Sequence, residues 1–514
     1  MHRSAFQRGL LPLALVVMAS GLHADPPPEF APGLESEPPG LSPYDGFGSA
    51  VAWLNDSTIA VGVRGADDGG AEAGAVRVLE FVEGGAQPAL VEVGLLVGET
   101  PGGQFGTAIA SSGAALAISS PYEDMNGLDN AGVVRVYLKE SGEWRLDNVV
   151  VGNVDNALLG AAVDAAHGYV LAGGGGSNQA EVVLLYIDDG DVYEVARFTN
   201  EFGSGARFGA AVAIAENNRL AIGAPGTNGQ RGSVAIYEYI FGGKGWQQTA
   251  VLEGTGSGDR FGEALEFAGR DRLLVSSPGG GVAGFGQVEV IDLDGDSPVV
   301  DAVIEGDRPE FGSTLAFDSA SGLLAVASIG VDFRGGVRVF RLAESVEVIC
   351  DLNPAVSNDY QLFGRGLGVR QGRIAAGAPF RDGAAGTRSG ACYLAGFGGD
   401  CDGDLLEDEW QLAAGLAEDC NENQVIDACD IADGSSSDGN GDGVPDECEE
   451  GPCGDFPWDI NANGSVGGDD LGLLLVAWGT CLDADCPADF TGDGVVSGAD
   501  LGLLLGYWGP CKDP

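Results

Sequence analysis

Short apolar runs separated by turn residues recur along residues 44–397. One unit shows the order: apolar runs at 210–214, 220–225 and 232–237, followed by a more polar run at 246–252. Turns rich in Gly, Asn and Asp separate these runs, and none of them has helical periodicity. Each unit therefore predicts four short β-strands.

A Phe-Gly pair marks the start of each unit. It occurs at Phe47, Phe105, Phe208, Phe261, Phe311 and Phe363, and Leu159-Gly160 takes its place in the third unit, so seven units follow at spacings of 49 to 58 residues. One four-stranded sheet cannot bury both of its faces, whereas a closed ring of such sheets can. We therefore predict an all-β, seven-bladed β-propeller at 44–397. An array of β-sandwiches is the alternative, but it does not account for the Phe-Gly register.

Closure of this ring is open in the sequence. The seventh unit supplies three strands and ends at Phe397. Either the last blade has three strands, or residues 25–43 supply the fourth. Seven prolines in those nineteen residues favour a stiff, extended linker. Cys350 and Cys392 lie in neighbouring units and are candidates for a disulfide that pins the last blade.

Acidic residues recur with a period of 19 in residues 398–450. The three copies are Asp400, Asp402, Asp404 and Asp408; Asp419, Asn421, Asn423 and Asp427; and Asp438, Asn440, Asp442 and Asp446. Side-chain oxygens at loop positions 1, 3, 5 and 9 can converge on a hard cation, so we expect Ca²⁺ here. The third copy adds Gly443 and Glu449, which completes an EF-hand loop pattern. An acidic linker is the alternative, and the repeated register with the interleaved Cys401, Cys420, Cys429 and Cys448 disfavours it.

A doublet offset by 30 residues fills residues 453–514. Its loops carry Asp459, Asn461, Asn463 and Asp470, then Asp489, Thr491, Asp493 and Asp500, at positions 1, 3, 5 and 12. Each loop leads into a helical pattern whose apolar face holds Leu471, Leu474, Leu475 and Trp478, or Leu501, Leu504, Leu505 and Trp508. We therefore predict a small α domain of two calcium loop–helix units, packed so that these faces are buried together.

Cysteines and the N-terminus indicate export. Residues 1–24 have Arg3 and Arg8 before an apolar run and a small-residue cleavage site, as a signal peptide does. Ten cysteines follow, eight of them after residue 400, which is typical of disulfides in a secreted protein. Cys453, Cys481, Cys486 and Cys511 are expected to staple the last domain, with no connectivity assigned. We expect a secreted, extracellular or cell-surface protein.

Charge limits the partners. The net charge is −52, and residues 400–514 hold 28 Asp or Glu with a single cation, Lys512. Such a surface repels nucleic acid and anionic membranes, so we expect neither as a partner. No segment after the signal peptide is long enough to cross a membrane, so membrane insertion is not expected either.

Catalysis has little support. Of three histidines, two fall in the signal peptide and His167 lies in a predicted turn, which argues against His-rich zinc sites and Ser-His-Asp chemistry. The sequence has no nucleophile elbow, phosphate loop or nucleotide fingerprint. Paired carboxylates for glycoside hydrolysis stay open, although no pair stands out. We expect no catalytic residues.

The body resembles a known family. Phe-Gly followed by Gly223-Ala224-Pro225 or Gly377-Ala378-Pro379 is similar to the FG-GAP repeat of integrin α-subunit propellers and of many secreted bacterial proteins. The resemblance implies a propeller that binds partners through loops on one face, here 122–131, 226–231 and 380–389, and implies no catalysis. The family's Asp-rich loop between the first two strands of a blade is replaced by short turns.

The tail resembles two further families. Residues 398–450 are similar to the calcium repeats of thrombospondin type 3 segments, and residues 455–511 to a type I dockerin. The dockerin resemblance implies calcium-dependent folding and docking onto a cohesin-like protein. Thr491 replaces the usual Asn, and Gly468-Asp469 and Gly498-Ala499 stand where the family more often has hydroxyl or aliphatic residues.

These patterns together predict a secreted, calcium-dependent binding or adhesion protein. Its propeller face would bind a protein or glycan, and residues 453–514 would dock it to a surface or complex. A polysaccharide-active component recruited through its dockerin is one alternative. A structural surface or matrix protein, which would self-associate in calcium without a discrete ligand, is the other.

Overall fold

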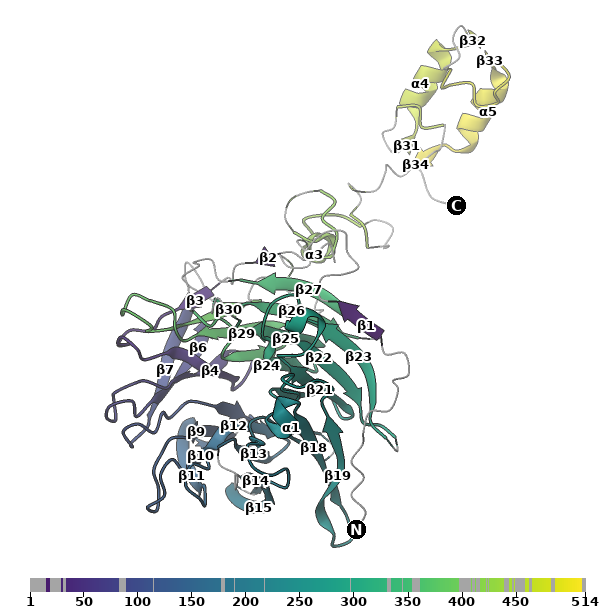
Figure 1. The fold of residues 1–514 in the computed structure, drawn as a ribbon. Helices are drawn as coiled ribbons and strands as arrows, with labels where there is room; N and C mark the ends of the chain where they lie inside the picture. Colours follow the sequence, from purple (N-terminus) through teal and green to yellow (C-terminus); the bar gives the residue numbers. More distant parts are fainter. Residues whose placement is uncertain are drawn as a thin grey trace. The chain divides into compact units, whose positions relative to one another are not determined.

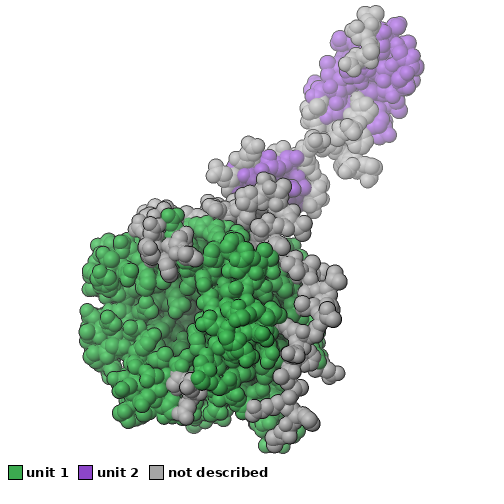
Figure 2. All heavy atoms as spheres, in the orientation of Figure 1, with its two compact units in different colours: residues 1–397 green, residues 398–514 purple. Residues whose placement is uncertain are grey.

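The computed structural model divides the chain into two compact units, residues 1–397 and 398–514, each described by itself (Figure 2). It describes residues 15–18, 29–30, 34–82, 89–113, 115–176, 181–188, 190–216, 218–295, 297–330, 334–343, 345–353, 361–396, 408, 412, 417–421, 423, 425–438, 443–445, 448, 458–461, 465–481 and 486–510. In these residues no helix is long and apolar enough to cross a membrane.

The first unit is a seven-bladed β-propeller, as the repeat predicts (Figure 1). The first four blades are β4 (Phe47–Trp53), β5 (Thr58–Val63), β6 (Ala75–Val82) and β7 (Ala89–Val97); β8 (Ile109–Ser111), β9 (Ala115–Ser120), β10 (Val133–Glu140) and β11 (Glu143–Val151); β12 (Leu159–Ala166), β13 (Tyr169–Gly174), β14 (Glu181–Asp188) and β15 (Asp191–Thr199); and β16 (Val212–Ala215), β17 (Arg219–Ala224), β18 (Ser233–Ile240) and β19 (Gly245–Glu253). Each is an antiparallel sheet in chain order.

The remaining blades complete the ring. They are β20 (Leu265–Ala268), β21 (Arg272–Ser277), β22 (Gln287–Asp292) and β23 (Val299–Glu305); β24 (Phe311–Asp318), β25 (Leu323–Ser328), β26 (Val337–Leu342) and β27 (Val346–Leu352); and β28 (Leu367–Arg370), β29 (Arg373–Ala378) and β30 (Ala391–Ala395). Short helices α1 (Thr227–Gln230) and η1 (Val282–Gly284) lie between the second and third strands of blades four and five. The first strand of every blade contacts the first strand of the next, and β28 contacts β4, so the ring is closed.

A strand from the N-terminal segment completes the seventh blade. β3 (Leu34–Ser36) pairs antiparallel with β30, so the second of the two closures left open by the sequence is the one observed. The linker interpretation is therefore wrong for residues 34–36. Glu37 then forms an ion pair with Arg381 and accepts a hydrogen bond from the Ala384 N–H at 2.6 Å, which fixes this segment to the seventh blade.

Two further short strands extend other blades. β1 (Leu15–Met18) runs parallel to β23, and β2 (Glu29–Phe30) runs parallel to β27. β1 lies within the predicted signal peptide, whose other residues fall outside the described part of the chain.

The Phe-Gly pairs form the contacts between blades. The six phenylalanines and Leu159 are all buried, and the glycine after each has φ between +85° and +95°. Gly223, in the second strand of blade four, lies against the carbonyl oxygen of Gly262 in blade five, so that a Cβ on Gly223 would overlap this oxygen. The motif thus repeats because neighbouring blades touch through backbone atoms.

Cys350 and Cys392 are both buried and form no disulfide, so the predicted staple of the last blade is wrong. Cys350 lies on β27, the fourth strand of blade six. Cys392 lies on β30 and packs with Phe47 and Leu79 of blade one, on the face of blade seven that points away from blade six. Burial raises the pKa of the Cys392 thiol to about 12.

The second unit is built from short helices and two-residue strands. It contains α3 (Asp427–Asp433), α4 (Gly468–Val476) and α5 (Gly498–Gly506), with β31 (Ser465–Val466), β32 (Gly479–Thr480), β33 (Val495–Val496) and β34 (Gly509–Pro510). α4 and α5 follow the two predicted loops of the 30-residue doublet, as expected.

Candidate functional site

The two loop–helix units of the doublet hold each other through backbone pairing. β31, which lies within the first loop, pairs with β34, which follows the second helix. β32, which follows the first helix, pairs with β33, which lies within the second loop. All four strands obey the 30-residue offset, so the domain has pseudo-twofold symmetry. Val466, Leu474, Val496 and Leu504 are the buried symmetric pairs of its core.

A buried aspartate ends each loop. The carboxylate of Asp470 accepts hydrogen bonds from the N–H groups of Asn461 at 3.2 Å and Gly467 at 2.8 Å. Asp500 accepts the symmetric bonds from Thr491 at 3.0 Å and Ser497 at 2.8 Å, and both aspartates are fully buried. Each thereby joins the start of its loop to the N-terminus of its helix.

Burial and hydrogen bonding have opposite effects on the pKa of Asp500, and hydrogen bonding dominates. Burial would raise the pKa of this carboxyl, but hydrogen bonds from the Ser497 and Thr491 N–H groups and from the Thr491 hydroxyl outweigh it. The pKa therefore lies below its ordinary value, and the group is a carboxylate at neutral pH. An ionised carboxylate is the form that a cation requires.

Position 1 of the loops also has a repeated role. The Asp489 carboxylate accepts hydrogen bonds from the N–H groups of Asp493 at 3.2 Å and Gly494 at 2.7 Å. Asp438 accepts the corresponding bond from Gly443 at 3.0 Å. The glycine at position 6 therefore lets the loop fold back around its first carboxylate. Asp459 is buried at the same position of its own loop.

In the second 19-residue repeat, the structure adds Asp430 to the predicted loop residues. Asp430 accepts hydrogen bonds from the side-chain amides of Asn421 at 3.1 Å and Asn423 at 2.8 Å. Asp419 accepts a hydrogen bond from the Asn423 N–H at 3.0 Å. Positions 1, 3, 5 and 12 thus meet in this loop as well. The signal was present, because Asp419 and Asp430 are spaced like Asp459 and Asp470 in the doublet.

Asp427, predicted as the ninth position of that loop, is placed differently. Its Oδ1 accepts a hydrogen bond from the Cys420 N–H at 3.0 Å, in the first turn of α3. Within the described residues, Cys420, Asp427 and Cys448 form the one cluster with metal-ligand spacing. Cys420 and Cys448 are bonded to each other, however, and disulfide sulfurs are not thiolate ligands.

Two disulfides are described in this unit, Cys420–Cys448 and Cys481–Cys486, and Cys429 is also disulfide-bonded. They confirm the expectation of disulfides in the tail and fit an oxidising compartment. The Oδ2 of Asp408 lies 3.3 Å from the Cys429 sulfur. The remaining predicted residues lie outside the described part of the chain: Asp400, Asp402, Asp404, Asn440, Asp442, Asp446, Glu449, Asn463, Cys401, Cys453 and Cys511.

The donor set fits calcium. The described residues at positions 1, 3, 5 and 12 of the loops offer carboxylate, amide and hydroxyl oxygens, and Ca²⁺ takes six to eight oxygen ligands in flexible geometry. A bound ion would neutralise part of the negative charge of residues 400–514, which hold 28 acidic residues and one lysine. Asp459, Asn461 and Asp470 would hold it in one unit of the doublet, and their 30-residue counterparts would hold it in the other.

The predicted burial of the helix faces is only partly observed. Leu474 and Leu504 are buried and Leu471 and Leu501 are half-buried, but the four outer residues of the faces are exposed: Leu475, Trp478, Leu505 and Trp508. The domain is too small to cover them, since each helix meets its neighbour along a single row of leucines. An apolar surface therefore remains on both helices.

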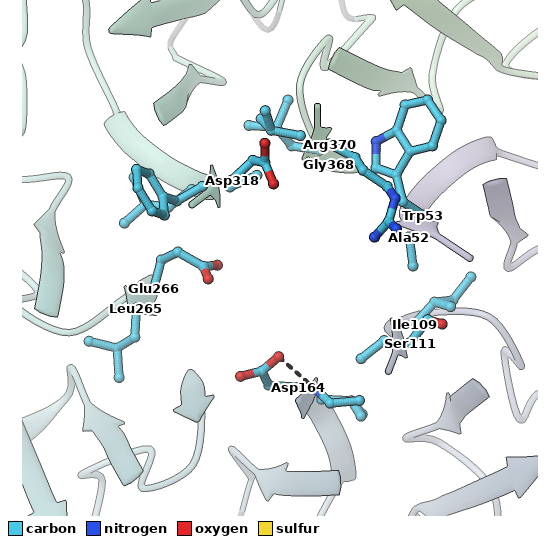
Figure 3. Close-up of a pocket in the computed structure, with 18 of the residues that line it drawn as sticks. Ala52, Trp53, Ile109, Ser111, Asp164, Leu265, Glu266, Asp318, Gly368 and Arg370 are labelled. Atoms are coloured by element: carbon cyan, nitrogen blue, oxygen red, sulfur yellow. Dashed lines mark hydrogen bonds between the residues drawn. The ribbon is translucent and has the colours of Figure 1, made fainter. Parts of the chain in front are cut away.

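A pocket of about 410 Å³ lies on the propeller axis, between the first strands of all seven blades. Figure 3 shows the side chains of Asp164, Glu266, Asp318 and Arg370 around this cavity, with the carboxylates of Asp164 and Glu266 pointing into it. Arg370 forms an ion pair with Asp56 at 2.6 Å. The first strands converge here, so side chains from blades far apart in the sequence meet.

Two of these carboxyls have raised pKa values. Burial raises the pKa of Asp164 to about 6, against hydrogen bonds from the Ile214 and Ala165 N–H groups that lower it. Burial, and then the charge of Asp164, raise the pKa of Glu266 well above its ordinary value. This pair holds protons at a pH where exposed carboxyls have lost them.

The loops predicted as a partner surface join the second and third strands of blades two, four and seven, so they lie at one end of the sheets. Glu123 in the first of them forms a buried ion pair with Arg135 at 2.7 Å, which is a structural role. His167 is exposed in the turn between β12 and β13, as expected.

Comparisons with known proteins assign no family to the chain. No protein-family model matches the sequence, and no curated protein matches it. Among solved structures, the chain is similar to the crystal structure of a protein from Lactobacillus plantarum, at 14% identity and a TM-score of 0.45, over 63% of this chain and 90% of that one. The propeller assignment rests on the seven sheets of this chain itself.

Proposed function

We propose that the protein is an exported, non-catalytic binding protein. Its propeller carries one binding surface, and its C-terminal domain is a calcium-stabilised module that docks onto a second protein. The propeller supports a binding or scaffold role, because its rigid ring holds loops from many blades at one end.

The apolar surface on α4 and α5 is the observation that carries the docking proposal. Val476 is 87% exposed, and Trp478 and Trp508 are each 49% exposed. Large exposed apolar groups on a domain with so small a core mark a protein interface, and tryptophan is enriched among the residues that dominate binding energy. The acidic surroundings favour a partner with an apolar groove and a basic rim.

Calcium is proposed to set the shape of this surface. Each loop joins its helix through a buried aspartate, so an ion bound in the loop would fix the helix that follows. Metal binding to the folded form alone adds its binding free energy to the stability of the domain. Docking should then require calcium although the apolar side chains contact no ion.

A capture experiment tests this proposal. The chain from residue 25 and a version ending at Glu450 are immobilised, then exposed to the secreted and surface fractions of the host with calcium or chelator. We expect a protein that is captured only with calcium and only by the longer chain. Trp478→Ala with Trp508→Ala should remove this capture, whereas Trp144→Ala in the propeller should not. Equal capture by both chain lengths would refute docking by the tail.

Glycoside hydrolysis is the second candidate, and the axial pocket favours it. Asp164 and Glu266 are neighbouring carboxyls with raised pKa values, and a carboxyl that keeps its proton can act as a general acid. Hydrolysis of neutral polysaccharides, abolished by Glu266→Gln and retained in Glu143→Gln, would establish this activity. If the unmodified chain hydrolyses none of these polysaccharides, the non-catalytic proposal stands.

A further inference from the structure

A second cavity of the propeller, of about 650 Å³, lies between blades three and four. β13, β14 and β15 line it from one side, and β18, β19 and Asn218 from the other. The cavity lies beside the start of β13 and β19 and the end of β14 and β18. At these points the first strand of a blade turns into the second, or the third into the fourth. The cavity is therefore at the opposite end of the blades from the loops 122–131 and 226–231.

Aromatic rings form most of this cavity. The ring of Trp246 lies 6.1 Å from that of Tyr169 and 5.6 Å from that of Tyr239, between centroids, and Tyr186 lies 4.9 Å from Tyr169. Phe241 is 76% exposed and Tyr239 is 40% exposed. Single exposed rings are common on protein surfaces, but a contiguous cluster of exposed rings marks a ligand or partner site.

The polar atoms that these rings carry have no hydrogen-bond partner among the described residues. Within the described part of the chain, no hydrogen bond involves the hydroxyls of Tyr169, Tyr186 and Tyr239 or the indole N–H of Trp246. The cation at the cavity, Arg197, is neutralised by ion pairs with Glu194 at 2.7 Å and Glu181 at 2.8 Å. The site therefore offers aromatic faces and neutral hydrogen-bonding groups, with no free positive charge for an anion.

We propose that this aromatic cavity binds a neutral oligosaccharide. The C–H faces of a sugar ring are apolar and pack on aromatic rings, while its hydroxyls pair with phenol and indole groups at the rim. An apolar peptide would leave those polar groups unpaired, which is costly. The net charge of −52 disfavours acidic glycans. The proposal names the ligand class of the propeller and rests on the proposed function for the statement that the propeller binds.

Blade two contains an internal comparison. Trp144 occupies the position of Trp246, since Lys139 pairs with Trp144 in the strand register as Tyr239 pairs with Trp246. There the Lys139 ammonium lies over the indole, 5.6 Å from its centroid, in place of an aromatic neighbour. Trp144→Ala is therefore a matched control, with the same residue type at the same place in a blade and no aromatic ring contact within the described part of the chain.

Affinity electrophoresis of the chain from residue 25 tests the proposal. Gels contain hydroxyethyl cellulose, arabinoxylan, galactomannan or dextran as neutral probes, polygalacturonate as an anionic probe, and chelator, which excludes a calcium-dependent contribution from the tail. We expect at least one neutral polymer to retard the protein. Trp246→Ala and Phe241→Ala should each weaken this binding by on the order of tenfold, and Trp144→Ala should leave it unchanged.

Several results would overturn the proposal. These are no retardation by any neutral polymer, retardation by polygalacturonate alone, or equal losses in Trp144→Ala and Trp246→Ala. Phe241 is so exposed that its truncation tests binding even where Trp246→Ala affects folding. Because the electrophoresis runs in chelator and the capture experiment needs calcium, glycan binding and tail docking can fail separately.

Discussion

At the scale of single residues, the propeller depends on glycines that bring neighbouring blades together. Gly262 has φ of +86°, and a Cβ there would lie 2.8 Å from Cγ2 of Val234. Gly223 has an ordinary backbone conformation but lies against the Gly262 carbonyl oxygen. One glycine is needed for both conformation and space, and the other for space alone. Phe261 is buried beside them.

Alanine substitutions separate these two needs. Gly223→Ala should lower the free energy of unfolding by about 3 kcal/mol, because its methyl group forces two backbones apart. Gly243 has the same φ of +86° in open space, so Gly243→Ala should cost only about 1 kcal/mol from the left-handed conformation. Denaturant unfolding measures both. Equal costs would show that close approach between blades does not explain the repeat.

The axial carboxyls predict a pH dependence. Folding raises the pKa values of Asp164 and Glu266, so the folded state binds more protons than the unfolded state above pH 4. Their contribution to stability is therefore present at low pH and is lost as pH rises through the folded pKa values, about 6 for Asp164.

Glu266→Gln should remove most of this loss. We expect Glu266→Gln to raise the free energy of unfolding by about 1 kcal/mol at pH 7.5 and to leave it almost unchanged at pH 4.5. The value at pH 7.5 is kept small because solvent that enters the pocket screens the buried charges. Melting temperatures across this range measure it, with the exposed Glu143→Gln as the control. A destabilisation of the same size at every pH would contradict the assigned pKa shifts.

At the scale of elements, the repeat predicts the blades but not their closure. A strand of three residues, β3, has no detectable periodicity, and the prolines around it dominate the pattern. The 19-residue register does not predict Asp430 for a similar reason, because only positions 1, 3, 5 and 9 carry Asp or Asn in all three copies, and the first copy has Gln411 at the twelfth position. The helical faces were predicted correctly as elements, whereas their burial depends on the size of the whole domain.

Truncations test the closing strand. A chain that begins at residue 34 keeps β3, whereas one that begins at residue 44 lacks it along with Glu37. The shorter chain should melt at a markedly lower temperature, because β30 becomes an unpaired edge and the ion pair between Arg381 and Glu37 is lost. The chain that begins at residue 34 should melt like one that begins at residue 25. Identical melting of all three chains would show that β3 contributes nothing to closure.

At the scale of the whole molecule, the two units have different sources of stability. The propeller has buried aromatic and aliphatic clusters along every blade, whereas the core of the doublet has five buried apolar residues. Small domains of this kind need disulfides or metal ions to fold. The chain therefore combines a self-sufficient scaffold with a tail that we propose depends on calcium.

Calorimetric unfolding of the chain from residue 25, in calcium and in chelator, tests this account most directly. We predict separate transitions for the propeller and the tail, with only the tail transition shifting upward in calcium. Asp470→Asn with Asp500→Asn should abolish that shift, whereas the exposed neighbour Asp469→Asn should retain it. A tail transition at the same temperature with and without calcium would contradict the account. So would a calcium shift that Asp469→Asn reduces as much as Asp470→Asn with Asp500→Asn does.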